Sequence, residues 1–158
     1  MLEGMVFHDE MVRYYSFLNL TEYQKVHELH YKEESKGYRE LCDYYMNHYN
    51  MLIPTEPMSR PDVIPENWYK HKRQDVDRNT KQNAVKTGIE KWVAWETETK
   101  DHYQDLYLSL IENGDAAAAK FVSRYVMEVD QELKYAQCNH LILESIGYDL
   151  TAIISKGL

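Results

Sequence analysis

The sequence predicts an all-α protein, a four-helix bundle in which a long crossover joins the second helix to the third. Three observations lead to this prediction. Apolar side chains recur every three or four residues in four long stretches. All 4 prolines fall between the second and third stretches, where they interrupt no helix. The other two connections are short, which makes the helices that they join antiparallel neighbours.

The first helix is expected over residues 5–19. Its inward residues are expected at helical spacing, and they are Val6, Glu10, Tyr14 and either Phe17 or Leu18. An acid therefore falls among apolar neighbours. Met5, Asp9 and Val12 form a competing face, so the inward direction of Glu10 stays open against that alternative.

The second helix is expected over residues 21–51, with Thr21 and Gln24 in the spacing of a capping box. Its expected inward stripe consists of Tyr31, Glu34, Tyr38, Leu41, Tyr45 and His48. His27 and Glu28 are assigned to the polar surface of this helix. Gly37 indicates either the close approach of another element or a local tolerance of glycine.

The crossover is expected over residues 52–77 and contains Pro54, Pro57, Pro61 and Pro65. A connection of this length is too long for a tight turn. In extended form it is long enough to cross the length of a bundle. The second and third helices would then run parallel to each other.

The third helix is expected over residues 78–112 and ends at Asn113-Gly114. Its inward stripe is expected to be Val85, Ile89, Trp92, Glu96, Thr99, Tyr103 and Leu106. The stripe thus carries the acid Glu96. A buried carboxylate costs several kcal/mol or takes up a proton, unless a cation, hydrogen bonds or a metal stabilise it.

The fourth helix is expected over residues 116–146, with Asp115 as its N-cap and Gly147 after its end. Two faces compete for the inward position. One face carries Phe121, Tyr125, Glu128, Glu132 and Ala136, and the other carries Val122, Val126, Val129, Leu133 and His140. A wide stripe would include both faces. The remaining tail is expected to form a short helix.

Length and charge restrict the class of protein. A chain of 158 residues suits a single domain, 1–158. The net charge of −8 opposes binding to nucleic acid, and no apolar run is long enough to span a membrane. We therefore expect a cytoplasmic protein. Its 14 tyrosines and 3 tryptophans are amphipathic, which favours a homo-oligomer with aromatic subunit contacts.

One carboxylate on each inward face is what a two-metal site in a bundle requires. The candidate ligands are Glu10, Glu34, Glu96 and Glu132, with Glu128 on the same face as Glu132. Hard oxygen ligands suit iron, in a di-iron centre, or manganese as the alternative. Two cations would also remove the repulsion between neighbouring carboxylates.

Three segments resemble one known group of proteins. WETETKDHYQDLYLSLIENGD and FVSRYVMEVDQELKYAQ are similar to the third and fourth helices of the ferritin-like superfamily, and KEESKGYRELCDYYMNH is similar to its second helix. The non-haem bacterial ferritins are the closest in pattern. The resemblance covers residues 20–146, and it implies a ferritin-like four-helix bundle that binds and oxidises iron.

The resemblance assigns Glu34 as the bridging glutamate of the second helix and Glu96 as the metal-binding glutamate of the third. Two positions depart from the family pattern. Gly37 stands where the family has the histidine of Glu-x-x-His, and Val129 stands where the fourth helix offers a glutamine or glutamate ligand. His30, one turn before Glu34, would replace the missing imidazole.

Three functions follow as hypotheses. The first is an iron-binding protein that oxidises ferrous iron and stores or buffers it, and it is a ferroxidase if the two-metal site works. The second is a metal-free structural or interaction protein, in which Arg39, Lys100, tyrosine hydroxyls or water pair with Glu34 and Glu96. The third is a two-metal carboxylate oxidase that acts on an organic substrate.

Overall fold

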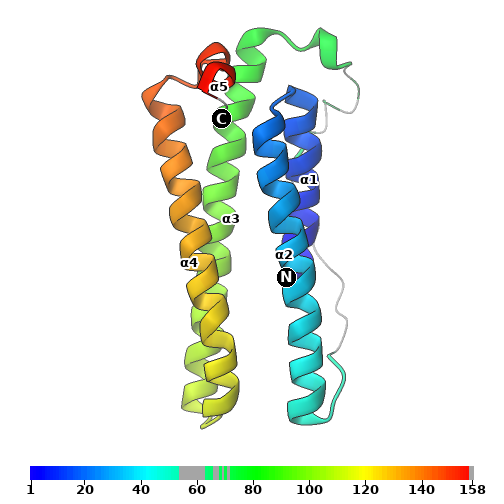
Figure 1. The fold of residues 1–158 in the computed structure, drawn as a ribbon, viewed down its shortest axis with the longest axis vertical. Coiled ribbons are helices and arrows are strands. Elements are labelled where there is room, and N and C mark those ends of the chain that lie inside the picture. Colours follow the sequence, from blue (N-terminus) through cyan, green and yellow to red (C-terminus); the bar gives the residue numbers. More distant parts are fainter. Residues whose placement is uncertain (54–62, 66–67, 69, 71, 157–158) are drawn as a thin grey trace. The chain divides into compact units, whose positions relative to one another are not determined.

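In the computed structural model, the residues described are 1–53, 63–65, 68, 70 and 72–156. Every regular element within these ranges is a helix, so the all-α prediction is confirmed (Figure 1). The helices are α1 (Leu2–Leu18), α2 (Thr21–Tyr49), η2 (Arg73–Asp75), α3 (Arg78–Glu112), α4 (Ala116–Ser145) and α5 (Leu150–Lys156). Pro54, Pro57 and Pro61 of the expected crossover lie outside the described residues. The parallel course of the second and third helices stays a prediction.

Contacts along the chain divide it into two compact units. The first consists of Met1–Arg78 with Ile154–Leu158, and the second of Asn79–Ile153. The first unit is built around α1 and α2, which lie side by side. The second is built around α3 and α4. Each long helix thus has a neighbour inside its own unit.

The turn between α1 and α2 consists of Asn19 and Leu20. Asn19 adopts a left-handed conformation with φ 62°, and its N–H donates to the carbonyl of Ser16. This is the common way to end a helix at asparagine. The Leu20 carbonyl accepts the first hydrogen bond of α2, from Gln24 N–H at 3.1 Å. The predicted capping box at Thr21 is therefore wrong, because the N-cap is Leu20 and no side chain caps this helix.

The buried face of α1 agrees only in part with the prediction. Glu10, Tyr14 and Leu18 are buried as expected, whereas Val6 is half-buried. The face is wider than a single stripe, and its further buried members are Gly4, Phe7, His8, Met11 and Tyr15.

The buried face of α2 is displaced from the predicted stripe. Its buried residues are Tyr23, His27, His30 and Gly37. Tyr31 and His48 are exposed, so their predicted inward orientation is wrong, and so is the assignment of His27 to the polar surface. The reason is that the buried stripe carries the polar residues His27 and His30 at helical spacing, whereas the aromatic Tyr31 lies on the exposed side.

Aromatic rings fill the core of the first unit. Tyr14 stacks on Trp68 with ring centroids 4.9 Å apart, and Tyr15 stacks on both Tyr23 and His27, at 5.1 and 5.3 Å. Such pairs are typically worth about 0.5–1.5 kcal/mol beyond the area that they bury. They also restrict how the rings of α1 and α2 can turn.

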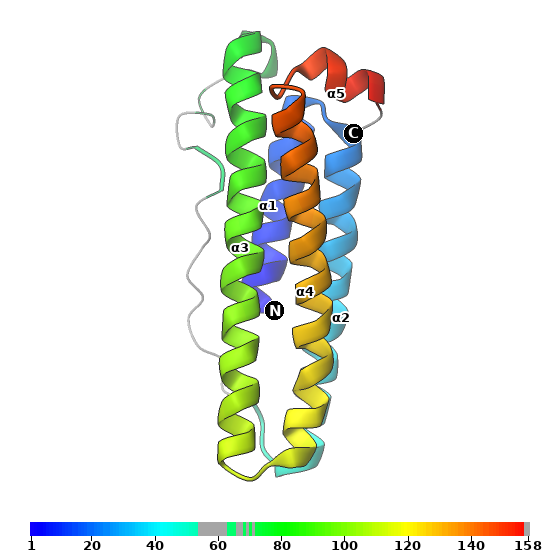
Figure 2. The ribbon, with the colours of Figure 1, turned by 90° about the vertical axis from the view of Figure 1, so that its left-hand side faces the viewer.

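In the second unit, α3 and α4 are antiparallel neighbours along their length (Figure 2). Gly114, with φ 77°, forms the turn between them, and the Asp115 carboxylate accepts a hydrogen bond from Ala118 N–H at 3.0 Å. The predicted stop at Asn113-Gly114 and the predicted N-cap at Asp115 are confirmed.

The two helices meet through three kinds of contact. Trp92 packs edge-on against Tyr135, Tyr103 stacks on Tyr125, and Lys100 forms an ion pair with Asp130. On α3 the stripe Val85, Ile89, Trp92 and Glu96 is buried as predicted. Leu106 is 42% exposed, so its predicted inward position is wrong.

The buried face of α4 takes members from both predicted faces. Its buried residues are Ala118, Ala119, Val122, Tyr125, Val129, Leu133, Ala136, Asn139 and Leu143. The wide stripe is thus confirmed, although Glu128 is exposed and Glu132 is half-buried. The predicted inward orientation of Glu128 is wrong. The next residue, apolar Val129, is buried, whereas the side chain of Glu128 lies in solvent.

The expected helical tail is α5, whose first turn is capped by Asp149, the acceptor of a hydrogen bond from Ala152 N–H at 2.9 Å. None of the helices in the described part of the chain combines the length and the apolarity that a bilayer-crossing segment needs.

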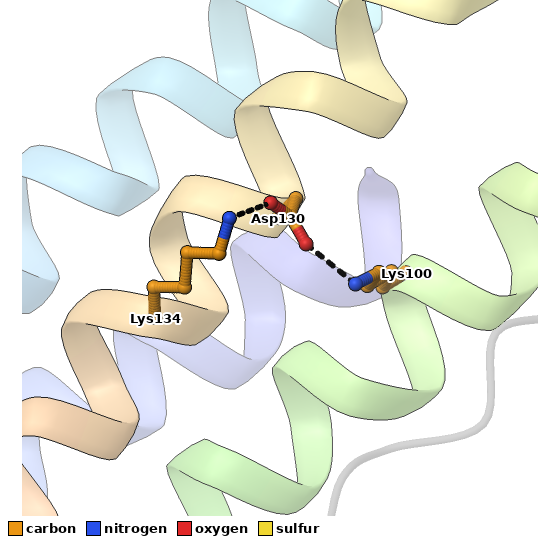
Figure 3. A network of polar contacts seen from close by, with 3 residues as sticks. All are labelled: Lys100, Asp130 and Lys134. Atoms are coloured by element: carbon orange, nitrogen blue, oxygen red, sulfur yellow. Dashed lines mark hydrogen bonds and ion pairs between the residues drawn. The ribbon is translucent and has the colours of Figure 1, made fainter.

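Asp130 on α4 pairs with two lysines, of which Lys100 links it to α3 (Figure 3). One carboxylate oxygen pairs with the Lys100 ammonium on α3, and the other pairs with Lys134 one turn further along α4, both at 2.5 Å. The hydrogen bonds from Lys100 and Lys134 lower the pKa of Asp130 from its ordinary value of 3.8 to about 2. The network therefore stabilises the charged carboxylate in the folded chain.

The first prediction concerns pH. Because the pKa of Asp130 is lower in the folded chain, its stabilisation is fully present above about pH 4 and is lost as the pH falls through about 2. Thermal unfolding of wild type and Asp130→Asn should differ at pH 6 and converge towards pH 2. Asp105→Asn, an exposed change on α3, controls for the lost charge. An equal difference at both pH values would contradict the prediction.

Candidate metal centre

Three predicted ligands, Glu10, His30 and Glu34, lie in the first unit. Glu10 is only 2% exposed, and its Oε2 accepts a hydrogen bond from Val63 N–H at 3.4 Å. The Arg13 guanidinium lies 3.8 Å from Oε1. The prediction that Glu10 points inward is therefore confirmed, and a cation on its own helix lies close to its carboxylate.

Glu34 lies on α2, opposite the start of α1. Its carboxylate is 3.6 Å from the terminal amine of Met1. Gly4 leaves room for it, because a Cβ atom there would be 2.6 Å from Glu34 Cδ. Glu34 is thus half-buried and forms an ion pair with the terminal ammonium group.

The first unit also contains a cluster of three histidines that includes only one predicted ligand. His8 on α1 and His27 and His30 on α2 are 1%, 0% and 7% exposed. His8 and His27 were not among the expected ligands. The signal for them was present in the helical spacing, since Gly4, His8 and Met11 share one face, and so do Tyr23, His27 and His30.

The three rings of this cluster, called the histidine cluster below, are closely spaced. The Nδ1 atoms of His8 and His27 are 3.0 Å apart. The ring of His8 is nearly parallel to that of His30, with centroids 5.0 Å apart, and it is 5.2 Å from that of His27. A ring nitrogen of His8 and one of His30 lie within 4.8 Å of each other. The ring nitrogens of residues from two helices therefore converge.

In the histidine cluster, burial favours the neutral forms of His8 and His27. Desolvation lowers the pKa of His8 well below its usual range, and the positive charges of His30 and the terminal amine add to this effect. Desolvation likewise lowers the pKa of His27, with contributions from His8 and His30. A neutral imidazole has one N–H and one lone pair, so one of the two facing Nδ1 atoms donates to the other. Neutral imidazole is also the form that binds metals.

The second unit holds the other predicted ligands, Glu96, Glu128 and Glu132. Glu96 is 1% exposed, and its Oε1 accepts a hydrogen bond from Trp92 Nε1 at 2.9 Å. This contact joins two residues one turn apart on α3. Glu132 is half-buried and Glu128 is exposed. Of these three acids, the structure buries Glu96 most completely.

The hypothesis of a metal-free protein expected Lys100 as a partner of Glu34 or Glu96. The Lys100 ammonium forms its ion pair with Asp130 on α4. The observed donor to Glu96 is instead the indole of Trp92. This partner was not expected from the sequence, because Trp92 counted there only as an apolar member of the inward stripe.

Comparisons with known protein families, with curated proteins and with solved structures gave no match to this chain. Membership of the ferritin-like superfamily therefore stays a prediction. The candidate donors are imidazoles and carboxylates in the first unit and carboxylates in the second.

The second prediction tests the space at Gly4. In Gly4→Ala the new methyl group meets the Glu34 carboxylate, a flexible side-chain end that can rotate away. The higher helix propensity of alanine, worth about 1 kcal/mol, should offset the cost. In a Glu34→Ala background no carboxylate is displaced, so the same change should stabilise the protein more. Urea unfolding of the wild type, the two single variants and the double variant measures this difference. Equal effects of Gly4→Ala in both backgrounds would contradict the prediction.

The third prediction tests the partner of Glu96. Trp92→Phe removes the indole N–H and leaves a buried carboxylate with one donor fewer, which should cost about 1–3 kcal/mol in addition to lost packing. In a Glu96→Leu background the hydrogen-bond part of this cost should disappear. A coupling energy below about 0.5 kcal/mol between the two changes would argue against a stabilising bond.

Proposed function

We propose that this chain is a ferritin-like, iron-binding protein that takes up ferrous iron as its substrate, oxidises it and stores or buffers the product. The observation that carries the proposal is the burial of ionisable oxygen ligands in helices, above all Glu96 at 1% exposure. Burying a carboxylate is costly unless hydrogen bonds or cations compensate for the lost water. A function that uses the charge explains why the acid is kept there.

The contacts around the buried acids are compatible with this role. Glu96 accepts a hydrogen bond from the Trp92 indole N–H, and Glu10 accepts one from the Val63 backbone N–H, so both carboxylates lie in polar surroundings. Oxygen ligands suit iron, and manganese as an alternative. Each ferrous ion would pass one electron to dioxygen or peroxide, and the carboxylates would stabilise the ferric product.

The resemblance to the ferritin-like superfamily supports the same proposal. It implies a di-iron ferroxidase and a homo-oligomer, with Glu34 and Glu96 as ligands. The amphipathic tyrosines and tryptophans are the residue types that subunit contacts favour.

A metal-free structural protein is the second candidate, and a specific observation favours it. Trp92 N–H satisfies Glu96, and the terminal amine lies beside Glu34, so both acids have partners in the absence of any ion. Elemental analysis of the purified protein separates the two candidates. Stoichiometric iron supports the first, and its absence after ferrous loading supports the second.

The fourth prediction is an iron titration. Apo-protein titrated aerobically with ferrous salt should form ferric product faster than a protein-free control. Glu96→Ala should slow this oxidation by at least about 10-fold, the size of effect expected when a metal site is perturbed. Glu98→Ala, an exposed change on the same helix, should not. A wild-type rate equal to the protein-free rate would refute the proposed function.

A further inference from the structure

The turn between α3 and α4 contains Asn113, the only asparagine in the chain that glycine follows. Both residues of this pair are exposed. A Cβ atom built at Gly114 would have nothing within 4 Å beyond its chain neighbours, so the glycine stands in open space. Because glycine has no side chain, its backbone nitrogen is less hindered than that of any other residue. The side chain of Asn113 therefore has an accessible nucleophile directly after it.

The reaction open to this pair is deamidation. Hydroxide removes the proton from the backbone nitrogen of Gly114, and this nitrogen attacks Cγ of Asn113 to close a cyclic succinimide. The bond between Cγ and Nδ2 breaks, and Nδ2 takes up a proton and leaves as ammonia. Water then opens the ring at either carbonyl, which leaves aspartate or isoaspartate at this position. The reaction consumes a water molecule, releases ammonia and needs no oxidant or reductant.

The folded turn holds both reacting groups in other bonds. Asn113 Nδ2 donates a hydrogen bond to the carbonyl of Ser109 at 2.8 Å and one to Ser109 Oγ at 3.4 Å. The N–H of Gly114 donates to the carbonyl of Ile111 at 3.0 Å. A hydrogen-bonded N–H gives up its proton only after the bond opens. The side-chain amide is tied to the preceding turn of α3, away from the residue that would attack it.

The cap of α4 holds the turn closed from the other side. Asp115 N–H donates to the carbonyl of Leu110 at 2.9 Å, and the Asp115 carboxylate accepts a hydrogen bond from Ala118 N–H at 3.0 Å. These contacts attach the residue after Gly114 to both helices. A change that loosens the cap is therefore expected to loosen the Asn113–Gly114 pair as well.

We propose that Asn113 is a site of spontaneous deamidation, and that opening of the α3–α4 turn sets the rate of the reaction. In the closed turn the side-chain amide and the Gly114 N–H are both bonded elsewhere. Breaking two hydrogen bonds of ordinary strength makes the open form about 10-fold or more rarer than in the unfolded chain. Every residue involved lies in the second unit, and none is a candidate metal ligand. The inference therefore does not depend on the proposed function.

The modified residue would weaken the end of α3. It loses the Nδ2 donor that now bonds to the Ser109 carbonyl. Its new carboxylate brings a negative charge to the C-terminal end of the helix, where the helix dipole is also negative, and it stands between Glu112 and Asp115 in the sequence. Isoaspartate in addition lengthens the main chain at a turn where Gly114 has φ 77°. The reaction therefore leaves a turn that opens more easily than the original one.

The fifth prediction compares the reaction in the native and the unfolded chain. Full-length protein is incubated at one mildly alkaline pH, with and without guanidinium chloride, and peptide mapping by mass spectrometry follows each asparagine. In the unfolded chain Asn113 should react fastest, ahead of Asn83, an exposed asparagine on α3 that alanine follows. In the native chain Asn113 should react about 10-fold or more slowly than in the unfolded one. Both aspartate and isoaspartate should appear, because the succinimide opens at either carbonyl.

Two substitutions of Asp115 test the role of the turn. Asp115→Ala and Asp115→Ser both remove a negative charge, but only serine keeps an oxygen that can cap α4. The ratio of the native to the unfolded rate should rise by about 2-fold or more in Asp115→Ala and stay near the wild-type value in Asp115→Ser. Circular dichroism reports whether each variant keeps its helices. If Asp115→Ala does not fold, Ala117→Gly loosens the first turn of α4 in its place, with the exposed Ala94→Gly on α3 as the control.

Three results would overturn the proposal. The first is a native rate of Asn113 deamidation equal to the unfolded rate. The second is a ratio of native to unfolded rate that the loosened-cap variant leaves unchanged. The third is a product that contains aspartate and no isoaspartate, because direct hydrolysis of the side chain forms no succinimide.

Discussion

Burying a polar group in a helical core is costly unless it is hydrogen-bonded, and each unit of this protein contains such a bond between buried side chains. His8 and His27 share a hydrogen bond across α1 and α2, whereas Trp92 and Glu96 share one along α3. Hydrogen bonds to charged groups contribute about 1.5–3 kcal/mol, and leaving such a group unpaired costs more. Trp92 thus serves both as a core side chain and as the donor to a buried acid.

The two units bury chemically different ligands. The first favours the neutral forms of His8 and His27 through desolvation and holds Glu34 beside a terminal amine. The second keeps Glu96 in place with an indole donor. Imidazole and carboxylate differ in the metals that they prefer, so one chain offers donors to two classes of ion.

The sequence predicted the helices well and the histidines poorly, for the same physical reason. Apolar periodicity identifies a buried face only where that face is apolar, as with Val85, Ile89 and Trp92 on α3. Glu96 was found because it interrupts this pattern. On α2 the buried face includes His27, which the sequence assigned to the polar surface, and His30, which it named as a candidate ligand. Their burial depends on the neighbouring helix, which a single sequence does not display.

The short turn at Asn19 and Leu20 also bears on how the chain folds. It brings together His8 and His27, which are only 19 residues apart in the sequence. Closing such a loop costs little entropy, since each doubling of loop length adds only about 0.6 kcal/mol. Contacts this local form quickly. The α1–α2 hairpin, with its imidazoles already adjacent, is therefore expected to assemble early and to act as a template for the rest of its unit.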